Sequence, residues 1–191
     1  MKFSTAPTID IIAPGLIAET WTEAEVLGSA VWLWMHGKSH RNLPLHTLPV
    51  LLLPAIKYQQ FILASENGRP VFYTSWANMN LEAEGRYLRQ HPVMMREADW
   101  VSGDRMWLLD WVAPFGHTRI MHRLLLHQLF ANRLARSLYH RGSETGAKIK
   151  HFKGRAVPPV EAEHWFATHP PAYIFKVKGC PAETNGEEEL I

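Results

Sequence analysis

Two strand-like runs that meet at Asn67-Gly68 constrain the fold of this 191-residue chain more strongly than any other sequence feature. The runs cover residues 58–65 and 70–76, and the Asn-Gly dipeptide between them accepts the positive φ angles of a tight hairpin turn. Because a hairpin joins neighbouring antiparallel strands, this pattern predicts a sheet that is at least partly antiparallel.

Helical and strand-like patterns alternate along the rest of the chain. Helices are predicted over residues 22–36, 81–90, 118–139 and 160–168, with a short helix inside the proline-rich loop 42–54. Further strands are predicted over residues 106–112 and 147–152. This mixture, without repeats, predicts an α/β or α+β fold in which helices flank a mixed sheet in three layers.

Length and local composition suggest how the chain is divided. Residues 1–20 lack a clear period and contain two prolines, so we expect a flexible N-terminal arm. Residues 21–170 have the length of a single domain. The remaining residues, 171–191, are acidic towards their end and are expected to form a disordered tail.

Composition excludes several classes of protein. No apolar run approaches the ~18 residues of a membrane span, and Asp10 and Pro14 interrupt any signal-peptide core. Cys180 is the only cysteine, so neither an intramolecular disulfide nor a thiolate metal site can form. These features predict a cytoplasmic protein. Cys180 lies in the terminal tail, and we do not expect it to act as a nucleophile.

Familiar cofactor and catalytic motifs are absent. The Gly37-Lys38 pair suggests a phosphate-binding loop, but Trp32 occupies the position where that motif needs its first glycine. No G-x-S-x-G elbow of a serine hydrolase occurs. Histidines recur at helical spacing without the glutamate of H-E-x-x-H, so we expect no metal and no bound cofactor.

His40 and Asp110 are the remaining candidates for chemistry. His40 follows the first predicted helix in a polar loop, and Asp110 interrupts an apolar, aromatic strand. A carboxylate in such a strand needs a hydrogen-bonding or cationic partner. Histidine would provide one, and the carboxylate would then fix its tautomer and support it as a base. An ion pair of Asp110 with Arg105 or Arg41 is the structural alternative.

Several ordered sequence blocks resemble the RTX toxin-activating lysine acyltransferases of the hemolysin-activating type. The similarity extends over about residues 26–155. The blocks are Val31-Trp32-Leu33-Trp34, His40-Arg41-Asn42, Leu53-Pro54-Ala55-Ile56, Ser75-Trp76-Ala77-Asn78, Ser102-Gly103-Asp104-Arg105 with Trp107, and Asp110-Trp111-Val112-Ala113-Pro114-Phe115-Gly116.

This resemblance implies a fold like that of the Gcn5-type N-acetyltransferases and transfer of a fatty acyl group from acyl carrier protein to internal lysines of an RTX pore-forming protoxin. It also implies that the functional histidine and aspartate of the family fall on His40 and Asp110, and that a homodimer is possible. Many members have Ser-Pro just before the histidine, whereas this chain has Lys38-Ser39.

Two further groups of residues acquire expected roles from this resemblance. Aromatic side chains are candidates for an acyl-binding slot, with ordinary core packing as the alternative: Trp32, Trp76, Trp107 and Phe115. Basic side chains are candidates for docking the acidic carrier protein, with a solvated helix face as the alternative: Arg119, Arg123, Arg133, Arg136, Lys150 and Lys153.

Three other functions remain open from the sequence. A non-catalytic escort that binds the protoxin is the main alternative. A small nucleic-acid-binding protein could use the same basic stretch, although we expect no nucleic-acid partner. An acetyltransferase using coenzyme A is the third, and the absence of a glycine-rich pyrophosphate loop argues against it.

Overall fold

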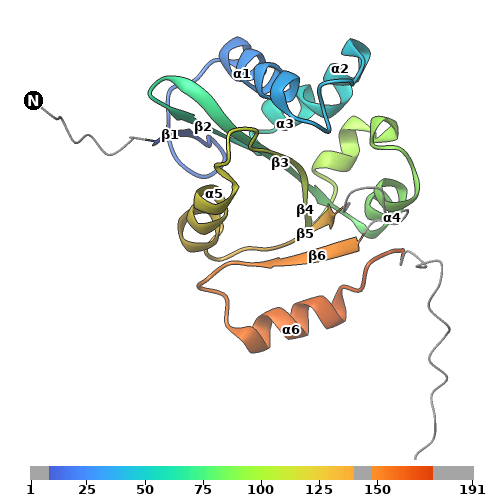
Figure 1. Cartoon of the computed structure of the whole chain (residues 1–191). Helices are drawn as coiled ribbons and strands as arrows, with labels where there is room; N and C mark the ends of the chain where they lie inside the picture. Colours follow the sequence, from blue (N-terminus) through green and yellow to red (C-terminus); the bar gives the residue numbers. More distant parts are fainter. Residues whose placement is uncertain (1–8, 140–147, 174–191) are drawn as a thin grey trace, which may run out of the picture.

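Six strands form one mixed sheet, in the order in which they occur along the chain (Figure 1). The computed structural model describes residues 9–139 and 148–173. The strands are β1 (Ile9–Ile12), β2 (Phe61–Glu66), β3 (Arg69–Met79), β4 (Arg105–Val112), β5 (Leu134–Tyr139) and β6 (Lys148–Lys153). Neighbouring strands are antiparallel except β4 and β5, which run parallel.

Helices cover both faces of this sheet, so the predicted mixed sheet flanked by helices is confirmed (Figure 1). The α-helices are α1 (Glu23–His36), α2 (Leu48–Leu51), α3 (Leu53–Lys57), α4 (Leu81–Arg89), α5 (Thr118–Leu124) and α6 (Pro159–Thr168). Single turns of other helix types are η1 (Leu45–Thr47), η2 (Pro92–Met94), η3 (Glu97–Trp100) and η4 (Leu125–Leu129). No helix of the described residues is both long and apolar enough to cross a bilayer.

The hairpin between β2 and β3 is present where the sequence predicts it. Asn67 and Gly68 have φ angles of 52° and 76°, the left-handed values that this turn requires at both positions. Two helices begin with a side-chain cap: the side chain of Thr22 accepts a hydrogen bond from the backbone N–H of Glu25, and that of Asn80 caps α4 in the same way.

Successive side chains along each strand point to opposite faces of the sheet, and they form a hydrophobic core on each face. On β2, Phe61 and Leu63 pack with the face covered by α1 and α3, while Ile62 and Ala64 pack with the face covered by α5 and η4. A third cluster, around Trp107 of β4, lies under α4. The sheet is therefore buried on both sides, and a polar group on its central strands must find a partner inside the protein.

The predicted single helix over residues 118–139 is wrong. The helical part ends at Leu129, and β5 follows it between β4 and β6. Leucines at helical spacing favoured the longer helix, but pairing with a strand on each side satisfies the backbone of residues 134–139 and decides their conformation.

The N-terminal arm predicted over residues 1–20 also needs correction. Residues 9–12 form β1, pair with β2 and pack isoleucine side chains against the core, because β2 would otherwise present an open edge. Residues 1–8 lie outside the described residues. Most of the tail predicted over residues 171–191 does too, since the description of that end stops at residue 173.

Candidate active site

His40 stands in the loop that follows α1. The helix ends at Gly37, whose backbone turns out of the helical region to φ −82° and ψ 127°. The next residues form turns that bring the imidazole of His40 back over the indole of Trp34, with 4.8 Å between ring centroids. The end of a rigid helix and an aromatic surface thus fix the position of the imidazole.

Asp110 lies in β4, next to β3 in the middle of the sheet. Its backbone carbonyl accepts a hydrogen bond from the hydroxyl of Thr74 at 2.6 Å, and its Oδ2 accepts a longer one from the hydroxyl of Ser75 at 3.4 Å. Both donors come from β3, so the strand pairing holds the carboxylate in place.

The fold joins these two side chains, which are 70 residues apart in sequence. His40 Nε2 lies 3.0 Å from Asp110 Oδ1, and the side chains are 18% and 13% exposed. Asp110 therefore pairs with His40, and Arg105 instead pairs with Glu84. Since an ionised carboxylate only accepts hydrogen bonds, Nε2 carries the proton of the neutral imidazole and Nδ1 carries the lone pair.

Nδ1 of His40 is therefore the nitrogen that can accept a proton. Among the described residues, no hydrogen bond reaches this atom. A Cβ atom at Gly37 would stand 3.5 Å from Nδ1 and 3.3 Å from a methyl group of Val112. The missing side chain of Gly37 thus keeps space beside the free nitrogen.

Two buried tyrosines surround the pair. Burial, followed by the negative charge of Asp110, raises the pKa of Tyr73 and of Tyr87 well above the ordinary value. Both phenols thus stay neutral near neutral pH, and neither competes with His40 as a base. The hydroxyl of Tyr73 has no hydrogen-bond partner among the described residues.

A small cavity adjoins the pair. It has a volume of about 210 Å³, and both His40 and Asp110 contribute to its wall. The other lining residues are mostly apolar or aromatic: Ser39, Leu43, Leu51, Tyr87, His91, Pro92, Met95, Trp100 and Leu109. An imidazole–carboxylate pair at the edge of an apolar cavity can remove a proton from a group bound there.

The four aromatic residues predicted to bind the acyl chain do not line this small cavity. Trp76 and Trp107 are buried in the core on opposite faces of the sheet. Trp32 and Phe115 are half-buried and pack against each other, with the guanidinium of Arg69 4.2 Å from the Phe115 ring. Their positions fit the core-packing alternative for Trp76 and Trp107, while Phe115 reaches a second cavity.

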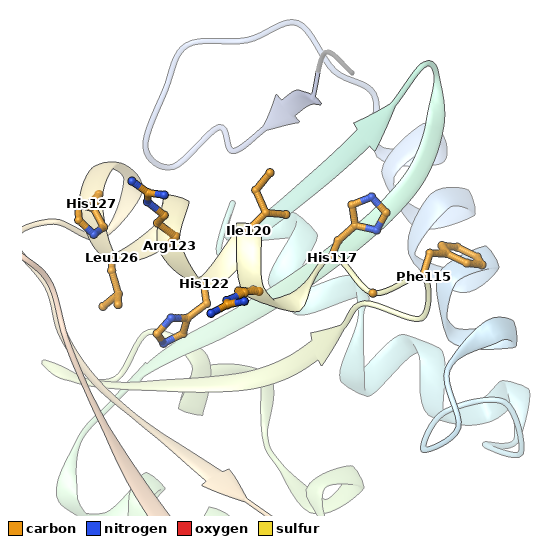
Figure 2. Close-up of a pocket in the computed structure, with 9 residues that line it drawn as sticks. Phe115, His117, Ile120, His122, Arg123, Leu126 and His127 are labelled. Carbon is orange, nitrogen blue, oxygen red and sulfur yellow. The ribbon is translucent and has the colours of Figure 1, made fainter. Parts of the chain in front are cut away.

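This second cavity is a groove of about 600 Å³ along α5 (Figure 2). We refer to it as the basic groove, because it is lined by Phe115, Gly116, His117, Arg119, Ile120, His122, Arg123, Leu126 and His127. Both arginines are exposed, and no ion pair of either with a described carboxylate is found. The groove therefore offers positive charge next to apolar surface.

The other residues predicted to dock a carrier protein are divided between surface and core. Arg133, Lys150 and Lys153 are exposed. Arg136 is fully buried, which lowers its pKa, and its guanidinium pairs with Glu84. The prediction that Arg136 docks a partner is therefore wrong, because the side chain is enclosed by α4, α6 and the sheet.

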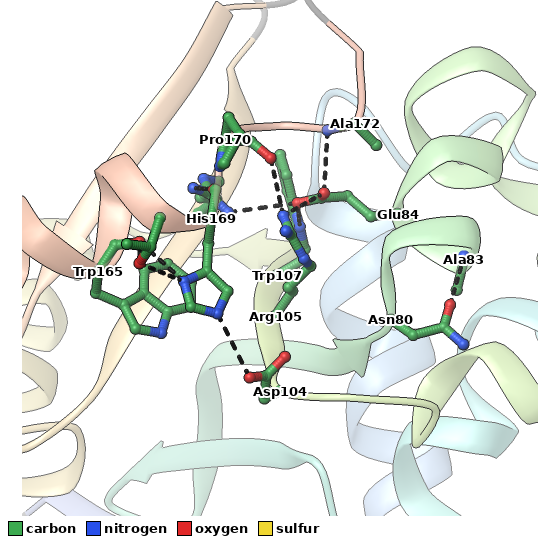
Figure 3. A network of polar contacts seen from close by, with 12 residues as sticks. Asn80, Ala83, Glu84, Asp104, Arg105, Trp107, Trp165, His169, Pro170 and Ala172 are labelled. Carbon is green, nitrogen blue, oxygen red and sulfur yellow. Dashed lines mark hydrogen bonds and ion pairs between the residues drawn. The ribbon is translucent and has the colours of Figure 1, made fainter.

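Glu84 is the centre of a buried polar network that sequence reasoning missed (Figure 3). Its carboxylate accepts hydrogen bonds from Arg105, from the indole of Trp107, from Arg136 and from the backbone N–H of Ala172. The sequence signal for this network is the pair of arginines inside apolar strands, Arg105 and Arg136, because a buried cation needs a carboxylate partner. None of the residues of this network lines the His40 cavity, and the network holds residues 169–172 against the sheet.

Comparison with known proteins identifies the class. The chain is 41% identical to the leukotoxin-activating lysine-acyltransferase LtxC of Aggregatibacter actinomycetemcomitans, covering 70% of this chain and 78% of that protein. It is 39% identical to the protein-lysine myristoyltransferase RtxC of Kingella kingae, covering 69% and 77%. It is 34% identical to the protein-lysine myristoyltransferase HlyC of Escherichia coli, covering 81% and 89%. Such relatives define an enzyme of the acyltransferase class.

The chain belongs to the RTX toxin acyltransferase family, whose profile matches residues 19–153. The matched range includes both His40 and Asp110 and ends with β6. Among solved structures, the loading GNATL domain of CurA from Lyngbya majuscula has a TM-score of 0.44 and 10% identity, covering 69% of this chain and 64% of that one.

Proposed function

We propose that this enzyme transfers a fatty acyl group from acyl carrier protein to lysine side chains of an RTX protoxin, and so activates the toxin. The observation that carries the proposal is the His40–Asp110 pair at the wall of the small cavity. Membership of the family and the names of the relatives support lysine as the acceptor and the protoxin as the partner.

Lysine attacks a thioester only as the free amine, which at neutral pH is about one part in a few thousand of the side chain. We infer that the free amine bonds to the thioester carbon while Nδ1 of His40 takes a proton from the attacking nitrogen and Asp110 stabilises the imidazolium. The carbon–sulfur bond then breaks, which leaves the amide and releases the carrier thiolate. The proton held by His40 neutralises that thiolate.

A covalent route is the competing mechanism. Nδ1 could attack the thioester itself, forming an acyl-imidazole that the lysine then cleaves. Rapid-quench mass spectrometry distinguishes the two routes, because only the covalent one produces His40 carrying the mass of the acyl group before any lysine is acylated.

The basic groove is the proposed docking surface for the carrier protein. Acyl carrier proteins are acidic, and Arg119 and Arg123 offer exposed positive charge beside the apolar side chains of Phe115 and Ile120. Reversing both arginine charges should weaken carrier binding, and added salt should weaken binding to the unmodified enzyme. Affinity that does not change with salt would contradict this surface.

Intact-mass analysis of the protoxin tests the function directly. Incubation with enzyme and acylated carrier protein should add the acyl mass, and parallel reactions with acyl-coenzyme A should not. His40→Ala should slow transfer about 10²- to 10⁴-fold without loss of folding. An escort protein would instead bind the protoxin without changing its mass, and a nucleic-acid-binding protein would retard labelled DNA or RNA in a shift assay.

The proposed setting is the cytoplasm, where a single-cysteine chain stays reduced and meets the carrier protein. The resemblance to the family also leads us to propose a homodimer, which light scattering on the purified enzyme would test.

A further inference from the structure

We propose that the small cavity beside His40 and Asp110 is the slot that receives the acceptor lysine side chain, rather than the fatty acyl chain. This inference rests on the proposed function and adds the place where one of its substrates binds. The cavity has His40 in its wall, so a group bound there lies next to the residue that acts as the base.

The walls match the two parts of a lysine side chain. Leu43, Leu51, Met95 and Leu109 offer apolar surface for the four methylene groups of the stem. Tyr87 also lines the cavity, and aromatic rings attract an ammonium group. The wall thus combines apolar surface for the lysine stem with polar side chains for its amine.

The charge of the cavity wall distinguishes a site for the acceptor lysine from a site for the acyl donor. The wall of the small cavity includes Asp110 and neither lysine nor arginine, so it suits a cation better than the basic groove does. The basic groove has the opposite character, with Arg119 and Arg123 in its wall. An acyl chain gains nothing from a carboxylate at its side, because that charge would lose hydration when the chain covers it.

The side chain of Trp100 lies in the wall of the cavity and can report on what binds there. The residue is 1% exposed and lines the cavity, yet its indole N–H has no hydrogen-bond partner among the described residues. A buried donor without a partner is costly, so the indole N–H is sensitive to changes in the packing around it. The same N–H is a spectroscopic reporter of what enters.

Titration of the enzyme with N-acetyl-lysine N-methylamide, followed by NMR of the tryptophan indole N–H groups, tests the slot without any acyl transfer. The Trp100 resonance should shift with increasing probe, and that of Trp21, which packs against Phe61 outside the cavity, should not. The norleucine analogue, which lacks the amine, should produce a smaller shift. A Trp100 resonance that ignores the lysine probe would overturn the proposal.

Filling the cavity gives a kinetic test. Leu51→Trp places a larger side chain on the wall, and we expect the KM for a lysine-containing acceptor peptide to rise about 10- to 200-fold. The KM for acylated carrier protein should stay within about twofold of that of the unmodified enzyme, and the preference between octanoyl and tetradecanoyl donors should not change. Leu45→Trp, at a residue that is 79% exposed and outside the cavity, is the matched control.

The results of these experiments test the lysine slot separately from the proposed acyltransferase function. A shift in chain-length preference with an unchanged acceptor KM would assign the cavity to the acyl chain and overturn the proposal. If Leu51→Trp does not fold, Leu43→Phe repeats the test at a second wall position. If the unmodified enzyme acylates no lysine while Trp100 still responds to the probe, the proposed function fails and the amine-binding slot stands.

Discussion

Replacing Asp110 by asparagine should separate the chemical role of the pair from its structural role. Asparagine has nearly the same shape, so the contact with His40 can persist, but the negative charge that supports the imidazolium is lost. Because the two side chains are only 18% and 13% exposed, solvent screens their interaction only in part.

The size of the effect follows from the geometry of this contact. A hydrogen bond to a charged group at about 3 Å contributes roughly 1.5–3 kcal/mol. Since about 1.4 kcal/mol corresponds to a factor of ten in rate, Asp110→Asn should lower kcat/KM about 10- to 160-fold. Thermal unfolding should change little, because Asp110→Asn keeps the volume of the side chain.

The assay is the rate of mass gain of the protoxin, with Asp104→Asn as the control at a side chain that is 76% exposed. Adding Asp110→Asn to His40→Ala should cost nothing further, because the carboxylate acts through the imidazole. An unchanged rate in Asp110→Asn, or additive losses in the double variant, would refute this reasoning.

Three further predictions concern stability. Glu84→Gln should lower the free energy of unfolding by about 3–5 kcal/mol in urea titrations, because it leaves buried guanidinium groups without a carboxylate; a loss below 1 kcal/mol would contradict the network. Gly68→Ala should cost about 1 kcal/mol, since its φ of 76° is strained for alanine although a Cβ would meet no atom within 4 Å; equal stability would count against the turn geometry. Partial desolvation, and then the charge of Arg136, lowers the pKa of His151. Protons therefore bind the unfolded state preferentially, and stability falls as pH drops below about 6.5. Thermal unfolding of His151→Phe should show a smaller fall than the unmodified enzyme.

Features encoded in a few consecutive residues could be predicted from the sequence. The Asn67-Gly68 turn and the caps of α1 and α4 depend on local backbone geometry, so a short window contains all the information. The conformation of β5 depends on strands on either side of it, and a periodicity of leucines cannot reveal such neighbours.

The candidate site also combines features that a short stretch of sequence predicts with features that depend on distant residues. The charge of Asp110 inside an apolar strand indicated that it needed a partner, and the resemblance to the family selected His40 from several candidates. The sequence groups Arg136 with the exposed cations around it because it predicts residues 134–139 as helix, and because the partner Glu84 lies 52 residues earlier. The small cavity is formed by four separate segments, so no single motif encodes it.

The network around Glu84 bears on where this enzyme can be shortened. The family profile ends at residue 153, yet the guanidinium groups of Arg105 and Arg136 donate to backbone carbonyls of Pro170 and His169, beyond α6. A truncated protein that stops with the profile would expose these groups and the strands around them. Residues 154–172 therefore cover the buried arginines of the domain, and a shortened protein made for expression should retain them.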